Sequence, residues 1–221
     1  MSTGEFNPSY IGKRNDIVSL ITPDVKSILD VGCSNGTLGK QIKLSNKGIV
    51  VHGIEIDNDM SDLAKTKLDK VFVGDAEHQI DLLTNNSSKY DCIIFADILE
   101  HLLNPWEIVS KSRLLLNHNG KIIVSIPNVN YYNTFINLYI KRYWPYEERG
   151  IHDKTHLRFF TKKNIIEMLD TAEFKVERLN RNYRFIDRNT KLNKISKFLG
   201  IPLIKDFFTF QYIILAKAQK R

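Results

Sequence analysis

The chain has 221 residues, of which 43% are hydrophobic and 26% charged, a composition typical of a globular protein and unlike that of a disordered or fibrous chain. It has no apolar run approaching the roughly 20 residues that a membrane-spanning helix needs. Residues 1–7 are polar and lack the basic-then-apolar pattern of a secretion signal, so we expect a cytoplasmic protein. The two cysteines, Cys33 and Cys92, are too few for a disulfide framework or a cysteine-based zinc site, and we expect both thiols to be reduced and buried.

Charge is unevenly distributed along the chain. Residues 1–140 contain 13 basic and 16 acidic residues, whereas residues 141–221 contain 19 and 9, a net charge of +10. Such a basic segment is typical either of a solvated basic surface or of a protein that binds an anionic partner, such as nucleic acid, a phosphorylated substrate or a lipid surface. Residues 183–221 form a basic C-terminal part, and the stretch 183–206 within it is hard to assign to regular structure.

Apolar, β-rich runs alternate with helical patterns as far as residue 126. Strands are predicted at 27–31, 49–55, 70–73, 90–95 and 121–126, and helices at 37–44, 59–68 and 105–116. An aromatic lid follows at 129–160, then a helix that Thr161 caps and that runs to Thr171, and two more strands at 175–182 and 208–217. The pattern predicts an α/β fold: a Rossmann-like, doubly wound, mostly parallel sheet of seven strands, with a lid inserted after the fifth. We expect residues 1–221 to form one domain.

The first predicted strand leads into a glycine-containing turn and then a helix. Gly32 and Gly36 let the backbone of this turn approach a ligand closely, and the helix start presents free N–H groups. The spacing is not the dinucleotide fingerprint, because Ser34 stands where its second glycine would be. Glu55 ends the next strand, where a carboxylate can accept hydrogen bonds from both hydroxyls of a ribose. Since the carboxyl ends of parallel strands share one sheet edge, these residues predict a nucleotide-type site.

Five ordered segments resemble the class I S-adenosylmethionine (SAM)-dependent methyltransferases, and the resemblance covers about residues 9–182. The segments lie at 28–36, 53–57, 74–77, 90–101 and 120–127. The family usually has a glycine at the position of Ser34. The resemblance implies that SAM is the cofactor (its product being S-adenosylhomocysteine) and that the fold is the class I methyltransferase fold.

The resemblance also implies which residues hold the cofactor. Glu55 would bind the ribose and Asp75 the adenine amino group. Asp30 would support the SAM ammonium or the glycine turn, and Arg14, one helical turn after Tyr10, would pair with the SAM carboxylate. The implied cofactor-binding set is Arg14, Asp30, Gly32, Cys33, Gly36, Glu55, Ile56, Asp75, Ala76, Phe95 and Ala96.

Methyl transfer to a hydroxyl needs alignment and a base. Catalytic candidates are Asp97, His101 and His156. The stretch 153–161, together with Pro-Asn after the fifth strand, resembles a family branch that is often encoded with glycan and polysaccharide genes. The last helix of that branch usually ends Ala-Gly-Phe, whereas this chain has Glu173 in place of the glycine. This implies O-methylation of a small-molecule or glycan-linked hydroxyl, with an anionic group of the acceptor near Lys154 and Arg158.

We expect the lid aromatics to wall a pocket over the cofactor, with His156 and Arg158 pointing into it. The aromatics are Tyr131, Tyr132, Tyr143, Trp144 and Tyr146.

A second resemblance concerns a divalent metal. Some RNA 2′-O-methyltransferases and quinone O-methyltransferases carry Glu-x-x-Glu-His after the fourth strand and a lid histidine, and hold a divalent ion there. The matching residues are Asp97, Glu100, His101 and His156, with Asp97 one carbon shorter than the family glutamate. Metal use stays open at this point, as do two alternative functions, an RNA (2′-O) methyltransferase and a non-catalytic SAM-fold binding protein, and the oligomeric state.

Overall fold

The computed structural model describes residues 12–184 and 205–219, and seven strands of these segments form one sheet. The strand order is β3-β2-β1-β4-β5-β7-β6, with β7 antiparallel to both of its neighbours and the other pairs parallel. The strands are β1 (Ser27–Val31), β2 (Val50–Glu55), β3 (Lys70–Val73), β4 (Tyr90–Ala96), β5 (Leu116–Pro127), β6 (Phe174–Tyr183) and β7 (Thr209–Ala218). The predicted mostly parallel, seven-stranded sheet is confirmed.

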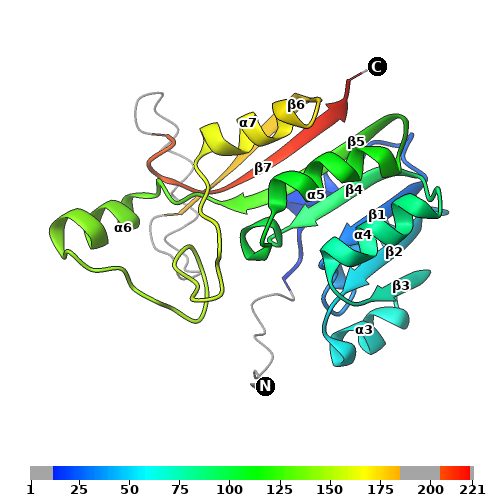
Figure 1. Ribbon diagram of the computed structural model, residues 1–221, viewed down its shortest axis with the longest axis horizontal. Helices are drawn as coiled ribbons and strands as arrows, with labels where there is room; N and C mark the ends of the chain where they lie inside the picture. Colours follow the sequence, from blue (N-terminus) through cyan, green and yellow to red (C-terminus); the bar gives the residue numbers. More distant parts are fainter. Residues whose placement is uncertain (1–11, 185–204, 220–221) are drawn as a thin grey trace.

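Helices cover both faces of this sheet. Figure 1 shows α4, α5 and α7 along one face, where they share a core with Leu29, Ile93 and Ile122. The alternate strand residues Ile28 and Cys92 face the opposite side, in a second core with α1, α2 and α3. The helices are α1 (Asn15–Val18), α2 (Thr37–Ser45), α3 (Asn58–Lys65), α4 (Ala76–Asn85), α5 (Pro105–Ser112), α6 (Tyr132–Phe135) and α7 (Lys162–Thr171).

Local capping explains where several helices begin. The side chain of Asn104 accepts the N–H of Glu107 at 3.3 Å, ahead of Pro105, and Thr161 with Asn164 forms a capping box at α7. Both starts agree with the sequence prediction. The predicted helix 105–116 is too long, because α5 gives way to the 3₁₀ turn η3 (Arg113–Leu115) and β5 already begins at residue 116.

One helix was missed by the sequence prediction. Helix α4 fills part of the interval between β3 and β4, where no element is predicted, and Asp75 caps it by accepting the N–H of His78 at 3.1 Å. Its buried residues are few, mainly Ile80 and Leu83, so its apolar pattern is weak in the sequence.

Both cysteines are buried, as predicted, at 5% exposure for Cys33 and 1% for Cys92. In the two described ranges we find no helix that combines the length and the apolarity needed to cross a membrane.

A close contact at Gly53 of β2 supports a stability test. A Cβ at Gly53 would lie 2.8 Å from Leu68 Cδ1 and would overlap the Sγ of Cys33. We expect Gly53→Ala to lower the free energy of unfolding by about 1–3 kcal/mol, the usual loss on overpacking a core. Denaturant unfolding measures it. The matched control is Gly12→Ala, where a Cβ meets nothing within 4 Å; equal stability of the two variants would contradict the assignment.

Candidate active site at the carboxyl edge of the sheet

The glycine turn between β1 and α2 lies over the end of β2. The N–H groups of Gly32 and Cys33 both donate to the carbonyl oxygen of Ile54 at 2.9 Å. Gly32 and Gly36 have φ of +73° and +75°, and Ser34, which replaces the family glycine, has φ of +48°. The turn therefore needs left-handed backbone at three positions, one of which a serine supplies at a steric cost that glycine avoids.

Glu55 joins this turn to the end of β2. Its Oε2 accepts the N–H of Ser34 at 2.7 Å and its Oε1 accepts the N–H of Asp57 at 2.9 Å. The residue is 9% exposed. A carboxylate has about four acceptor positions, so two stay available to a ligand.

Asp30 is buried at the end of β1 without a partner. Both carboxylate oxygens are inaccessible and accept no hydrogen bond from any part of the chain that the structure describes. Burial, and then the charge of Glu55, raises the pKa of Asp30 to about 7. A cationic group placed here would supply the missing partner, which fits the ammonium of SAM.

The other predicted cofactor residues lie along the same edge. Ile56, after β2, is 67% exposed, whereas Phe95, in β4, is fully buried. Asp75 and Ala76 start helix α4 after β3, and Ala96 ends β4. The structure therefore brings the ends of β1 to β4 together as predicted, and it gives Asp75 a second task as the α4 cap.

Asp97 and Arg14 pair with each other. Arg14 Nη1 lies 2.5 Å from Asp97 Oδ2, and Arg14 also contacts Asp16 (3.0 Å) and the Ser125 hydroxyl (2.7 Å). Asp97, at a φ of +59°, additionally accepts from Ser125 and Gln211. The structure thus directs Asp97 toward this network. Tyr10, the expected neighbour of Arg14, lies outside the described residues.

Glu100, His101 and His156 form a separate cluster. One potential ligand atom of each lies within 4.8 Å of the others, and the two imidazole centroids are 4.7 Å apart. Glu100 and His101 belong to the 3₁₀ turn η2 (Leu99–His101) after β4, and His156 belongs to the lid. Asp97 is not a member of this cluster, so three of the four predicted metal candidates are brought together.

Backbone carbonyls orient both imidazoles. His156 Nδ1 lies 3.2 Å from the carbonyl oxygen of Ile151, and His101 Nδ1 lies 3.3 Å from that of Thr155. A carbonyl only accepts, so in the neutral rings Nδ1 carries the proton and Nε2 the lone pair. Burial lowers the pKa of both histidines, and the neighbouring His101 lowers that of His156 further. Both rings are therefore neutral bases near neutral pH.

Glu100 completes the cluster from the buried side. Its Oε1 is 3.9 Å from His156 Nε2, and its Oε2 is buried with no hydrogen-bond partner in the described part of the chain. Burial, and then the charge of Asp97, raises the pKa of Glu100 well above its usual value. An uncharged carboxyl next to two neutral imidazoles follows.

The lid aromatics differ from the expectation of a pocket wall. A small open hollow is lined by His156 and Arg158, as predicted, but its aromatic residues are Phe159 and Phe160. Of the expected wall, Tyr131 is buried in a separate aromatic cluster and Trp144 packs against His152 and Phe159. Tyr143 and Tyr146 are 59% and 75% exposed. The expectation was wrong for these aromatics because the α6 part of the lid projects away from the sheet (Figure 1), whereas the part with His156 and Arg158 lies against Glu100.

Comparison with known proteins agrees with this fold. A family model described as a methyltransferase domain matches residues 7–179, most of the chain. The chain therefore belongs to this methyltransferase-domain family, and the resemblance found in the sequence is confirmed.

Individual relatives are more distant. The ubiquinone biosynthesis O-methyltransferase of Coxiella burnetii (strain Dugway 5J108-111) is 28% identical over 113 residues, 50% of this chain and 47% of that protein. That of Vibrio atlanticus (strain LGP32) is 26% identical over 155 residues, 66% of this chain and 62% of the relative. The chain thus matches about half the length of the first relative.

Solved structures share the fold over nearly the whole chain. A SAM-dependent methyltransferase from Archaeoglobus fulgidus has a TM-score of 0.65 at 20% identity, covering 95% of this chain and 96% of that one. Magnesium protoporphyrin IX methyltransferase from Synechocystis PCC 6803, with bound S-adenosylhomocysteine, has a TM-score of 0.63 at 16% identity, with 99% and 90% covered. The class I methyltransferase fold predicted from the sequence is confirmed.

The raised pKa of Asp30 predicts an unusual pH dependence of stability. An unfolded aspartate ionises near pH 3.9, so the unfolded chain releases this proton first, and stability falls as pH rises from about 4 to about 7. Asp30→Asn, which cannot ionise, is expected to make the cofactor-free protein more stable than wild type at about pH 8 and to reduce this slope. Urea unfolding at about pH 5 and about pH 8 measures both.

Asp91→Asn is the control of opposite sign. Burial alone would raise the pKa of Asp91, but hydrogen bonds from Asn117, Lys26 and Ser27 lower this pKa below its usual value. The Asp91→Asn variant should therefore lose stability at about pH 8. If Asp30→Asn also destabilises the protein there, Asp30 is ionised and partnered in the folded state, against our assignment.

Proposed function

We propose that the protein is a SAM-dependent methyltransferase that methylates a hydroxyl of a small-molecule or glycan-linked acceptor. The observation that carries the proposal is the position of two neutral imidazoles, His101 and His156, beside the sheet edge that holds the buried carboxylates Asp30 and Glu55. A base next to a cofactor site is what O-methylation requires. The relatives named O-methyltransferases support the same reaction.

The residues of the edge fit SAM. Asp30 would face the ammonium, Glu55 would accept from the ribose hydroxyls, and Ile56 would lie against the adenine, with Asp75 near the adenine amino group. Arg14 is a candidate for the carboxylate only if it releases Asp97 or Asp16, because both occupy its guanidinium in this structure.

The histidines supply the proton acceptor. When bound, SAM provides a methyl group on a sulfonium, and the hydroxyl that receives it must lose its proton. His156 is the proposed base because its Nε2 carries the lone pair, on the side of the ring near Glu100. The ring centroid of His101 lies 4.7 Å from that of His156, so His101 is a second candidate proton acceptor. The carbonyl oxygens of Ile151 and Thr155 orient this pair, and the buried Glu100 carboxyl lies beside it. Asp97 would act only indirectly, through Arg14.

The same cluster is a candidate divalent-metal site. Two imidazole nitrogens and the unpartnered Oε2 of Glu100 form a donor set that suits Mn²⁺ or a similar ion, and would suit Mg²⁺ less well. A bound ion would lower the pKa of an acceptor hydroxyl and replace the base function of His156.

The acceptor would approach from the lid side. The side chains that line the shallow hollow there combine an imidazole and a guanidinium with Phe159 and Phe160, groups of the kind that would contact a hydroxylated ring or sugar with an anionic group. Arg158 Nη2 donates to the carbonyl of Leu103 at 2.6 Å and so is fixed at the rim. The basic part of the chain suggests RNA as an alternative acceptor. The turnover assays described below, run with RNA in place of the small acceptors, test this alternative.

The ribose assignment predicts the effect of Glu55→Ala on the cofactor. Two charge-assisted hydrogen bonds, each worth about 1.5–3 kcal/mol, would be lost, so SAM affinity should fall about 100-fold or more. Titration calorimetry measures it, with a thermal melt to show that the variant folds. Asp59→Ala, an exposed carboxylate at the start of α3, is the control and should bind normally. Equal affinity in the Glu55 variant and wild type refutes the ribose role.

The base assignment predicts a kinetic loss without a loss of cofactor affinity. His156→Gln should lower turnover by about 10²–10⁴-fold, the range for a lost general base, and leave SAM binding unchanged. Turnover is followed as S-adenosylhomocysteine release with a panel of phenolic and sugar acceptors. His152→Gln is the matched lid control, because His152 faces Thr134 and Trp144 and not the cluster.

Chelation separates the two versions of this site. If EDTA abolishes turnover and Mn²⁺ or Mg²⁺ restores it, His156 is a metal ligand; if EDTA has no effect, His156 is the base. Near-normal turnover of His156→Gln on an accepted substrate would end both assignments.

A further inference from the structure

A projecting arm, residues 132–146, extends from the end of the sheet. It consists of α6, the π-helical turn η4 (Ile136–Ile140) and an extended stretch, and Figure 1 shows α6 pointing away from the sheet and from the other helices. Its apolar and aromatic side chains lie in solvent with exposed fractions of 41% to 75%; they are Phe135, Leu138, Tyr139, Ile140, Tyr143 and Tyr146. Exposed apolar side chains concentrated on one projecting segment are typical of an interaction site.

The arm is built to present these side chains. Two backbone hydrogen bonds stabilise the turn: the N–H of Lys141 donates to the carbonyl oxygen of Ile136, and the N–H of Tyr143 donates to that of Asn137. The side chain of Asn137 is buried. The rings of Phe135 and Tyr139 stack with their centroids 4.9 Å apart, and Phe135 also contacts Phe207. Ordered main chain with apolar residues directed outward is a defined surface and not a frayed end.

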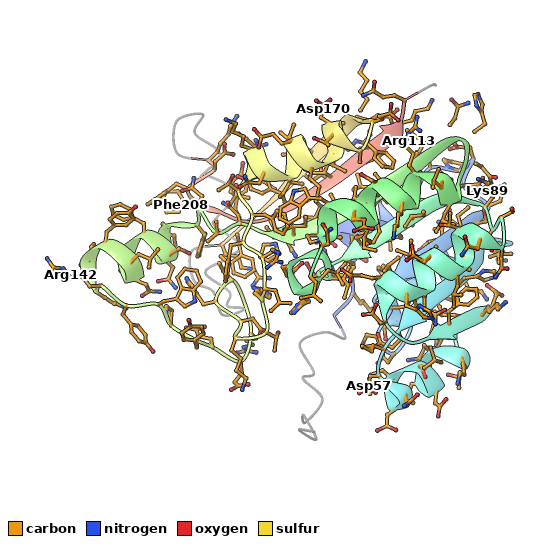
Figure 2. All side chains as sticks on the ribbon, in the orientation of Figure 1. Asp57, Lys89, Arg113, Arg142, Asp170 and Phe208 are labelled. Atoms are coloured by element: carbon orange, nitrogen blue, oxygen red, sulfur yellow. The ribbon has the colours of Figure 1, made fainter. Side chains whose placement is uncertain are left out.

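The charge of the arm has one sign. Residues 129–146 contain Lys141 and Arg142, both exposed, and no acidic residue. Figure 2 labels Arg142 at the outer end of the arm, and Phe208 near its base. The base is joined to further positive charge in the sequence, because residues 185–204, which connect Arg184 to Lys205, contain four basic residues and one acidic residue.

We propose that the projecting arm docks on the surface of an anionic lipid bilayer. Tyr139, Ile140 and Tyr143 would enter the boundary between headgroups and acyl chains, where tyrosine and aliphatic side chains are most stable. Lys141 and Arg142 would lie among the anionic headgroups, their aliphatic stems along the apolar layer. The helical part, η4 after α6, is too short to span the roughly 20 residues that a crossing needs, so the arm lies on the membrane.

The charges favour this occupant over a second copy of the chain. A two-fold contact through the arm would bring Lys141 and Arg142 of both copies to one interface, and the arm itself contains no acidic residue to neutralise them. The nearest acidic residues, Glu147 and Glu148, follow the arm, and Glu148 already pairs with Lys154 at 2.7 Å. An anionic bilayer neutralises the same charges. The proposal does not rest on methyl transfer, because binding to lipid is measured without cofactor or acceptor.

Vesicle flotation of the full chain tests the proposal. The probes are vesicles of phosphatidylcholine alone and of phosphatidylcholine mixed with phosphatidylglycerol. We expect wild type to float with the mixed vesicles, less so at high salt, and Tyr139→Ser/Ile140→Ser to partition about tenfold less or weaker still. Lys141→Ser/Arg142→Ser should lose the preference for the anionic vesicles. The matched control is Leu44→Ser, a 75% exposed leucine on α2, which should float like wild type.

Three results would overturn the proposal. The first is the absence of wild-type protein from the floated anionic vesicles, and the second is equal flotation of wild type and the Tyr139→Ser/Ile140→Ser variant. The third is a dimer of wild type in sedimentation without lipid that becomes monomeric in this variant, which would assign the arm to contact with a second copy. All substituted side chains are exposed, so unchanged melting temperatures confirm that a loss of flotation is not a loss of fold.

Discussion

Two hydrogen bonds to one carbonyl oxygen hold the candidate site together. The backbone oxygen of Glu100 accepts the N–H groups of Leu157 and Arg158 at 2.8 and 3.0 Å. His101 directly follows Glu100 on the sheet side of this junction, and His156 directly precedes Leu157 on the lid side. The register of the junction therefore sets the 4.7 Å separation of the two imidazoles. It also explains why the buried carboxyl of Glu100 lies beside a residue 56 positions later in the sequence.

The centre of the sheet was predictable because β1, β4 and β7 are buried on both faces, so each appears in the sequence as a continuous apolar run. The motif positions followed from the same topology, since parallel strands place their carboxyl ends at one edge. Two departures from the family glycines also had a structural meaning. Ser34 and Glu173 have φ of +48° and +60°, so each retains the left-handed backbone that glycine usually provides. The change of residue leaves the turn intact at the steric cost of a side chain.

The partners of Asp97 were not predictable in the same way. Arg14, Ser125 and Gln211 are 83, 28 and 114 positions away from it, so their contacts depend on how three strands and the N-terminal segment converge. The only sequence signal was a polar residue within an apolar strand, as at Ser125 and Gln211. The spacing to Glu100 and His101 suggested a shared metal site instead. The competition for Asp97 between a nearby cluster and a distant arginine is decided by tertiary structure, in favour of the arginine.

The division of charge along the chain corresponds to a division of the sheet. The acidic first 140 residues form β1 to β5, whose carboxyl edge holds the buried Asp30 and Glu55, suited to a cationic ligand. The basic remainder forms most of the lid, with β6 and β7, and the positive end of the arm. His101 and His156 lie where the two parts meet, one from each. A site at this boundary can receive a cationic methyl donor from one side and an acceptor from an anionic environment on the other, and each ligand is attracted to its own half. Because His156 and the projecting arm belong to the same lid, the position of the proposed base is connected through one continuous segment to the surface on which the arm would dock.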